Sequence, residues 1–536
     1  MKKILLTLTI LFVVGHLPAQ VITDSTAYLD INQVKALIGS GGMNFCKLPA
    51  YTAAYEYPAS SGHTTIFSST LWIGGKSNDS LYLAAERYRQ NGRDYNPGPV
   101  MDTNFYTAEL PNWNKVWKIN KADIDYHIAH WSDGGYTVPA SIANWPAMGN
   151  TAHGMNYFQA PFQDVDSDFF YNPAAGDYPL IRGDQAIYFI FNDSARGHFD
   201  SGGKCMGVEV HGMAYAYNSN PELQKAVFVN YLFYNRSNRT YDSLYIGNFT
   251  DVDLGYCCDD FVGCDSSLST FYVYNGQLTD AQYGSNPPVQ TITMLGKPMT
   301  SFVYFNNAMP GWTAAMTDPS NAKEYYSYMK GFWKDGKHFI YGGNGYPNAP
   351  EDTILTNYMF PGYPNDSLQW NEVNAGDAPS DRRGLGVSGP YTLAPGDYIS
   401  FDLVFITVDS GFSKSTSFPN IDNMLGVVAD FQNYFDSTYN NNGNDIALGI
   451  HNNQTNNNYA LQCKIYPNPV SNLLTIELDG NTKKSNFEIL NSMGQTVYQG
   501  NIVNKTIVST NNFPSGFYII KLENGQTYAI KKLIKQ

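Results

Sequence analysis

Three aspartates spaced two residues apart, Asp164, Asp166 and Asp168, are the residues of this chain whose spacing points most clearly to chemistry. Carboxylates at positions one, three and five of a turn point toward one centre, and a backbone carbonyl near position seven can complete a ring of oxygens. Asp177, which follows Gly176, can close this ring from the far side. The spacing predicts a calcium loop, although it lacks the usual glycine at position six and an acid at position twelve. The alternative is a solvated acidic turn.

A second group of acidic residues surrounds a cysteine-rich turn in the middle of the chain. It consists of Asp251, Asp253, Asp259, Asp260 and Asp265. We rank a calcium-stabilised loop first and a solvated acidic loop second. A glycosidase acid and nucleophile come third, because that chemistry needs a sugar-binding cleft.

The six cysteines are too few for a disulfide scaffold, although an exported protein can hold one or two bridges. Cys257 and Cys258 are neighbours in sequence and cannot easily bond each other. The spacing therefore favours a bridge from one of them to Cys264 or to Cys205. We therefore favour a structural role for these cysteines over a metal-binding or redox role.

Other polar motifs carry less weight. Glu209 and His211 share one face of an expected strand and could serve acid-base chemistry, but no nucleophile motif accompanies them. His127 and His130 have a spacing that some metal sites use, without an identifiable partner. Arg182 to Asp184 form a tripeptide that occurs often by chance. No catalytic residue is assigned from the sequence.

The composition indicates the kind of structure that must position these residues. Aromatic residues make up 15% of the chain and charged residues 15%, with 41 Tyr, 47 Gly and 28 Pro. Such a composition predicts a mainly β protein with many turns: a large β-sandwich-type body with a few short helices, and a small C-terminal immunoglobulin-like β-sandwich. The body exceeds one ordinary core, so we expect two packed subdomains or one sandwich with large insertions.

Hydrophobic periodicity places the main elements of the body. Three consecutive strands, 207–217, 223–234 and 241–249, are expected to form one sheet. Further strands are expected at 63–73, 81–87 and 398–408, and helices at 30–38, 121–130 and 421–434.

The last seventy residues alternate apolar and polar side chains in short runs separated by Asn-Gly and Gly-Gln turns, as a small antiparallel sandwich requires. Four landmarks occur in order along them: Tyr466-Pro467-Asn468-Pro469, Met493-Gly494-Gln495, Gly516-Phe517-Tyr518 and Lys531-Lys532. With this order the tail resembles the type A C-terminal sorting domain of the type IX (Por) secretion system. The resemblance covers the tail alone. It implies export across the outer membrane of a Bacteroidota-type bacterium, removal of the tail, and release or attachment at the cell surface.

The start of the chain fits the same route. Lys2 and Lys3, the apolar run 4–14 and the small residues before Gln20 are typical of a secretory signal peptide. The expected organisation is a signal peptide at 1–20, a β-rich body at 21–439, an Asn-rich linker at 440–462 and a sorting domain at 463–536. We expect no transmembrane segment in the mature form, because no later apolar run approaches the ~20 residues that a span needs.

The formal charge of the chain limits the classes of molecule that it can bind. The whole chain carries a formal charge of −14, while the tail from residue 464 onward is basic, so the body is more acidic still. Such a body repels phosphate backbones and attracts divalent cations, which excludes nucleic acid as a partner and favours calcium as a cofactor. Expected partners are the type IX secretion machinery and an extracellular glycan or surface protein.

The sequence leaves two functions open. The first is a secreted or cell-surface protein without enzymatic activity: an adhesin, a glycan binder or a structural surface protein. The alternative is a secreted hydrolase that acts on polysaccharide or peptide. Stretches of the body, such as residues 69–76 and 259–265, are similar to large secreted proteins that carry the same tail, and this likeness supplies no activity.

Overall fold

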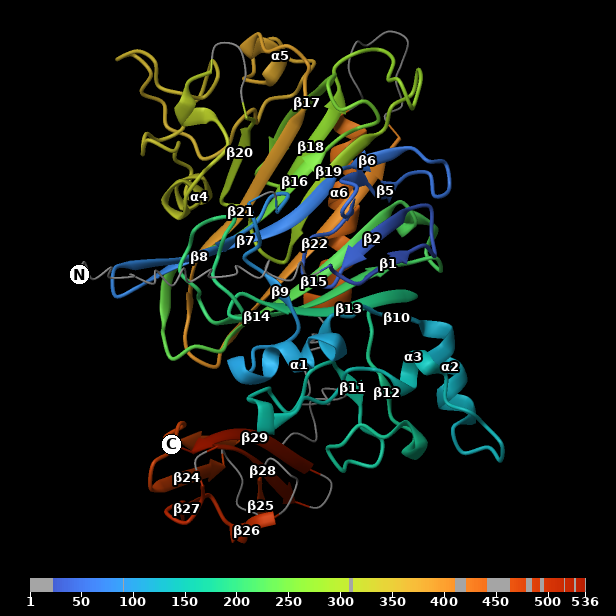
Figure 1. Cartoon of the computed structure of the whole chain (residues 1–536), viewed down its shortest axis with the longest axis vertical. Helices are drawn as coiled ribbons and strands as arrows, with labels where there is room; N and C mark the ends of the chain where they lie inside the picture. The colour runs from blue at the N-terminus through green and yellow to red at the C-terminus, as the bar shows by residue number, and fades with distance from the viewer. Residues whose placement is uncertain are drawn as a thin grey trace, which may run out of the picture.

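The computed structural model describes residues 23–89, 91–307, 312–409, 421–440, 463–478, 484–491, 496–514, 516–524 and 527–535. The expected signal peptide, 1–20, and all but the first residue of the expected linker lie outside these residues. The body is a β-sandwich with helical and irregular insertions, and the mainly β fold expected from the composition is confirmed (Figure 1).

The larger sheet of the body has nine antiparallel strands. In spatial order they are β10 (Trp117–Asn120), β13 (Gln185–Asn192), β14 (Val208–Ala216), β15 (Ala226–Asn235), β22 (Tyr398–Val408), β19 (Val289–Leu295), β18 (Thr270–Asn275) and β17 (Asp260–Asp265), with β9 (Asn96–Pro97) paired to β13.

The facing sheet has five strands, and smaller sheets flank the sandwich. The five are β20 (Ser301–Phe305), β21 (Arg382–Leu393), β16 (Tyr241–Val252), β7 (Ser68–Ser77) and β8 (Ser80–Ala85). The flanking strands are β1 (Thr26–Leu29), β2 (Lys35–Gly39), β5 (Tyr55–Glu56) and β6 (Thr64–Ile66), then β3 (Cys46–Lys47) with β4 (Thr52–Ala53), and β11 (Phe162–Gln163) with β12 (Tyr178–Pro179).

The helices are α1 (Thr103–Trp113), α2 (Lys121–His130), α3 (Ala140–Ala143), α4 (Ala322–Met329), α5 (Glu372–Ala375) and α6 (Ile421–Phe435).

Both faces of the nine-stranded sheet are buried. Between the two sheets, Phe271 of β18 stacks on Phe302 of β20 with ring centroids 4.9 Å apart. Gly384 of β21 permits this approach, because a Cβ there would lie 2.5 Å from the Phe271 ring. On the other face, Phe431 of α6 stacks on Phe228 of β15 at 5.7 Å. The strand expected at 207–217 is observed as β14, Val208–Ala216, and is buried along its whole length because each of its two faces packs against a different layer.

Two expectations for the body are wrong. Residues 30–38 are not a helix, because β1 and β2 form a hairpin in which Leu29 pairs with Ala36, and the Asn32 side chain accepts a hydrogen bond from the backbone N–H of Val34 in its turn. The three strands expected as one sheet are divided. After β15 the chain crosses to the other layer, where β16 pairs with β21 and β7. The Asn235 amide holds this crossing by donating to the carbonyl oxygens of Arg239 and Leu393.

The expected bridge from Cys257 or Cys258 to Cys264 or Cys205 is also wrong, since none of these four cysteines forms a disulfide. Cys264 points into the core, where its Sγ lies 3.2 Å from the carbonyl oxygen of Met359. Cys257 and Cys258 lie in the turn before β17, and Cys205 precedes β14. The burial of Cys264 on β17 therefore separates its side chain from the turn that holds the other two.

A buried histidine links β8 to the segment after β13. His198 Nδ1 lies 2.7 Å from the Leu83 carbonyl oxygen and Nε2 lies 2.8 Å from the Asp193 carbonyl oxygen. Carbonyl oxygens only accept, so both ring nitrogens donate and the imidazole is charged. Burial alone would lower the pKa of His198, but the Cys205 side chain and the carboxylates of Asp193 and Asp94 raise it to about 10.

This raised pKa gives a testable dependence of stability on pH. The contribution of His198 to the free energy of unfolding is fully present below about pH 6.5, its unfolded pKa, and is lost as the pH rises to about 10. We expect the stability difference between wild type and His198→Gln to shrink by ~4–5 kcal/mol over that range. Urea unfolding of both proteins at pH 6, 8 and 10 measures it, and a difference that stays constant would contradict a charged His198.

The C-terminal module consists of two small antiparallel sheets. One contains β23 (Cys463–Tyr466), β24 (Leu473–Leu478) and β27 (Lys505–Ser509). The other contains β26 (Thr496–Ile502), β25 (Ser485–Asn491), β28 (Gly516–Asn524) and β29 (Thr527–Lys535). Their inner faces form a separate apolar core that includes Val470, Ile476, Ile489 and Leu522. The strands expected from the alternation are confirmed.

The sequence landmarks of the tail lie at defined places in this module. Tyr466 ends β23, and the Pro467-Asn468-Pro469 stretch follows it. Asn468 accepts a hydrogen bond from the backbone N–H of Ile534 at 2.8 Å, which ties this stretch to the last strand. Gly516 begins β28 and Tyr518 lies within it, while Lys531 and Lys532 lie on β29. Gly494 is outside the described residues.

Candidate calcium loop and its aromatic surface

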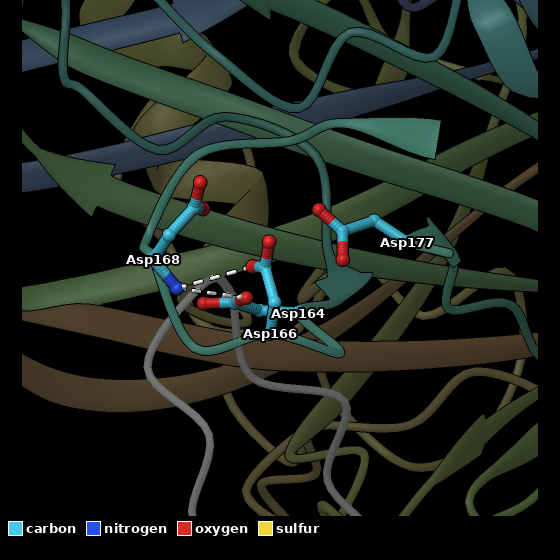
Figure 2. A group of neighbouring side chains, drawn as sticks. All are labelled: Asp164, Asp166, Asp168 and Asp177. Atoms are coloured by element: carbon cyan, nitrogen blue, oxygen red, sulfur yellow. Dashed lines mark hydrogen bonds between the residues drawn. The ribbon is translucent and has the colours of Figure 1, made fainter. Parts of the chain in front are cut away.

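The first acidic cluster lies in the loop between β11 and β12. These two strands pair through Phe162 with Pro179 and Gln163 with Tyr178, so the ladder closes the loop at its base. Asp164, Asp166, Asp168 and Asp177 each offer a carboxylate oxygen, and these oxygens all lie within 4.8 Å of one another. Figure 2 shows Asp177 facing Asp164 from the other side of the loop, as the sequence spacing predicts.

Backbone N–H groups hold the carboxylates in place. Asp177 accepts hydrogen bonds from Val165 and Asn172, each at 2.8 Å, and so joins the start of the loop to its end. Asp164 accepts from Phe169 at 2.9 Å. Phe169 stands at position six and has a φ of 63°. It therefore adopts the left-handed conformation for which calcium loops use glycine at that position.

The cluster is unfavourable as a group of free anions. Asp177 is buried, Asp164 is half-buried, and Asp166 and Asp168 are exposed. Burial raises the pKa of both Asp164 and Asp177 above the ordinary value, and N–H donors offset this only in part. A divalent cation among these oxygens would relieve both the desolvation and the mutual repulsion.

An aromatic surface adjoins the loop. Trp131, which follows α2, lies against Gly176, where a Cβ would be 2.9 Å from the indole. The same helix carries Tyr126, whose ring lies 4.4 Å from that of His130. Tyr126 is 56% exposed, Trp131 37% and the loop residue Phe170 54%. The sequence did not predict this surface, because only the folded chain brings α2 to the loop.

The histidines of α2 have structural roles. His127 is buried, and its Nε2 lies 3.0 Å from the carbonyl oxygen of Asp177, so it positions α2 on the loop. Burial lowers the pKa of His127. His130 pairs with Asp133 at 2.8 Å on the surface. The helix expected at 121–130 is confirmed, but its two histidines face different partners.

The second acidic group is not a single cluster. Asp251 and Asp253 lie together and are joined by Asp381, which the sequence analysis did not include. Asp265 accepts hydrogen bonds from Ser267 and Leu268 in the turn after β17. Asp260 is fully buried and accepts from Leu254, and Asp259 is 6% exposed. Burial and the nearby Asp280 raise the pKa of Asp259 to about 6.

Glu209 and His211 do meet, but inside the protein. His211 Nε2 lies 2.9 Å from Glu209 Oε1, and its Nδ1 lies 2.6 Å from the Tyr188 hydroxyl. Glu209 also accepts a hydrogen bond from the backbone N–H of Val100 at 2.6 Å. Tyr188 and His211 border a cavity of about 10 Å³. This is below the ~300–1,000 Å³ of ordinary ligand pockets, and we assign the network to the core.

The Arg182 to Asp184 tripeptide is not displayed as an adhesion motif. The Arg182 side chain is buried and pairs with Asp402 at 2.6 Å. Its guanidinium also lies over the ring of Tyr439, at 4.3 Å. The arginine therefore joins the sheet to the segment after α6.

Comparison with known proteins gives a result for the tail only. No curated protein sequence matches the chain. A polysaccharide lyase is among the similar solved structures, with 8% identity, 61% of this chain covered and a TM-score of 0.20, which is too low to support an argument. The match spans about a third of the lyase, 34% of its length.

The tail indicates the cellular destination of the protein. Residues 464–536 match the family model of the secretion system C-terminal sorting domain. None of the described helices is both long and apolar enough to cross a membrane. The domain indicates export by the type IX secretion system to the cell surface or the extracellular space. The C-terminal part of this chain, residues 464–536, is a secretion system C-terminal sorting domain.

Proposed function

We propose that the body is a non-enzymatic cell-surface or secreted protein that binds an extracellular glycan at the aromatic surface beside the β11–β12 loop, with calcium in that loop. The observation that carries the proposal is the Trp131 indole, which lies against Gly176 of the loop while more than a third of the side chain is open to solvent. Exposed aromatic faces stack on the apolar faces of sugar rings. Tyr126 and Phe170 extend the apolar area beside the acidic loop.

Calcium has two roles in this proposal. It holds Asp164, Asp166 and Asp168 together at metal–oxygen distances of ~2.3–2.6 Å, and so fixes the loop on which Trp131 rests. Any coordination positions that the protein leaves open could also bind sugar hydroxyls, because calcium accepts six to eight oxygen ligands. The acidic body excludes polyanionic backbones and leaves neutral glycans as the favoured class.

The burial of Asp259 and Asp260 favours binding over hydrolysis. Asp259 and Asp260 are two adjacent members of the group in which a glycosidase acid and nucleophile were considered, and they are 6% and 0% exposed. A glycosidase places its two carboxyl groups on either side of a bound sugar in an open cleft. The buried pair does not offer such access.

The organisation of the precursor is part of the proposal. We propose that residues 1–20 are removed as a signal peptide, that 21–439 form the functional body, and that cleavage in the linker at 440–462 releases the body from the sorting domain at 463–536. The sorting-domain match supports the last boundary.

Replacement of Trp131 by alanine tests the proposed binding surface. We expect Trp131→Ala to lose roughly five- to thirtyfold in affinity for the glycans that the wild-type body retains on a glycan array. Loss of one stacked ring of ~1–2 kcal/mol accounts for this factor. Phe199→Ala is the matched control, because Phe199 is a 64% exposed ring outside the loop region. Equal loss in both variants, or none in either, would contradict the assignment.

Calcium in the loop is tested by thermal unfolding. Wild type should melt a few degrees higher in 5 mM calcium than in chelator, because a ligand that binds only the folded state stabilises it. Asp166→Asn combined with Asp168→Asn should lose the part of this shift that the loop supplies. Asp125→Asn, an exposed substitution on α2, should keep the full shift. If the double variant also keeps it, the loop is a solvated acidic turn.

A further inference from the structure

A cluster of three carboxylates, Asp251, Asp253 and Asp381, lies on the outer face of the five-stranded sheet. Asp251 of β16 is directly opposite Arg383 of β21. Asp253 lies just after β16, and Asp381 lies just before β21. One carboxylate oxygen from each of the three aspartates lies within 4.8 Å of the others. Two neighbouring strands, distant in sequence, thus place three acids around one point.

Two of the carboxylate oxygens are buried without a hydrogen-bond partner. Asp251 is 5% exposed; its Oδ2 accepts a hydrogen bond from the Tyr88 hydroxyl at 2.6 Å, while its Oδ1 has no partner. Asp381 Oδ2 accepts from Arg383 Nη2 at 2.9 Å, and its Oδ1 is likewise without a partner. Buried polar atoms in folded proteins nearly always have a hydrogen-bond partner or a metal ion beside them. We therefore expect a ligand at each of these two oxygens.

The nearby arginine does not satisfy the cluster. Arg383 Nε is 4.0 Å from Asp251 Oδ1, which is too long for a hydrogen bond. The same guanidinium lies 3.3 Å from Asp318, so its charge is shared with a fourth acid. Asp318 also pairs with Arg87 at 2.6 Å. The three carboxylates therefore retain an excess of negative charge.

We propose that Asp251, Asp253 and Asp381 bind one calcium ion, which joins the end of β16 to the start of β21. The donors are all carboxylate oxygens, which suit a hard cation. Oxygens that all lie within 4.8 Å of one another can be held ~2.3–2.6 Å from one calcium ion, and calcium tolerates the irregular geometry that donors from two strands impose. Asp253 and Asp381 are half-buried, which leaves the ion a route from solvent.

This site is independent of the proposed glycan surface. It uses no residue of the β11–β12 loop, and it stands on the five-stranded sheet. Calcium here would act on the stability of the sandwich and not on ligand contact. The two sites can therefore be tested separately.

Calcium binding by single-site variants tests the inference. The starting protein is the full mature body with Asp166→Asn and Asp168→Asn, which disables the first loop. We expect it to bind one calcium per molecule in equilibrium dialysis with calcium chloride alone, and to melt several degrees higher in 5 mM calcium. Adding Asp253→Asn should abolish both effects. Adding Asp242→Asn, an exposed acid on the same strand, should leave both unchanged.

Melting in chelator distinguishes a metal site from a purely structural role. Without calcium, Asp253→Asn removes repulsion among three acids, so it should melt at or above the temperature of the starting protein. With calcium, the protein that carries Asp253→Asn should melt at a lower temperature than the starting protein. The inference is overturned if the starting protein binds no calcium, or if Asp253→Asn lowers the melting temperature equally with and without the ion.

Discussion

Deletion of residues 463–536 is expected to stop export and leave the protein in the periplasm. The reason is that the sorting-domain match and the landmark residues lie in this module, while the expected signal peptide serves only the inner membrane. The module has its own apolar core, so its removal should leave the body folded. Fractionation of cells into periplasm, outer membrane and medium, followed by immunoblotting, measures the distribution. We expect the exported share to fall from most of the protein to a background level.

A converse experiment provides the control. Residues 440–536 joined to a periplasmic reporter should carry that reporter to the cell surface or medium, and the reporter without them should stay behind. Intact mass of the exported wild type should show that both ends have been removed. If the truncated chain still reached the surface, the tail would not be the export signal.

Replacement of Glu372 by glutamine is expected to destabilise the body by ~3–5 kcal/mol, the cost of leaving a buried charge without its partner. Glu372 Oε1 lies 2.6 Å from Arg382 Nη2, and both side chains are fully buried. Glu372 Oε2 also accepts a hydrogen bond from the backbone N–H of Val262 at 2.7 Å. The pair thus connects β21 of one sheet to β17 of the other. Burial raises the pKa of Glu372 to about 7, so urea unfolding at pH 8.5, where this carboxylate is ionised, measures the loss.

Two further variants separate the charge from the packing. Glu351→Gln, in an exposed loop, should change the free energy of unfolding by less than ~0.5 kcal/mol. Arg382→Met combined with Glu372→Met should recover part of the stability that Glu372→Gln loses, because it leaves no unpaired buried charge. If Glu372→Gln costs less than ~1 kcal/mol, the ion pair does not hold the two sheets together.

The parts of the fold that follow local rules could be predicted from the sequence. The tail strands and β22 are marked by alternation between turn residues, and α6 by apolar residues three and four apart. The helix expected at 30–38 rested on the three-residue spacing of Ile31, Val34 and Leu37. That prediction was wrong because the chain turns at Asn32 between two strands whose burial depends on distant partners. The crossing of β16 to the second sheet has no local signal, because Asn235 holds Leu393 from far along the chain.

The residues of the candidate sites also differ in whether the sequence alone could predict them. Asp164, Asp166 and Asp168 could be found because their spacing alone places them in one turn. Asp381 could not, because only the pairing of β16 with β21 brings it to Asp253. Trp131 likewise reaches the first loop only after α2 has packed on it.

Incubation of the purified mature body with its bound glycan is the most direct test of the account. We predict retention on the immobilised glycan in calcium, release in chelator, and no new reducing or unsaturated ends in the supernatant after prolonged incubation. Release of shortened glycan by wild type, lost in Asp259→Asn with Asp260→Asn, would contradict a binding protein and establish a hydrolase.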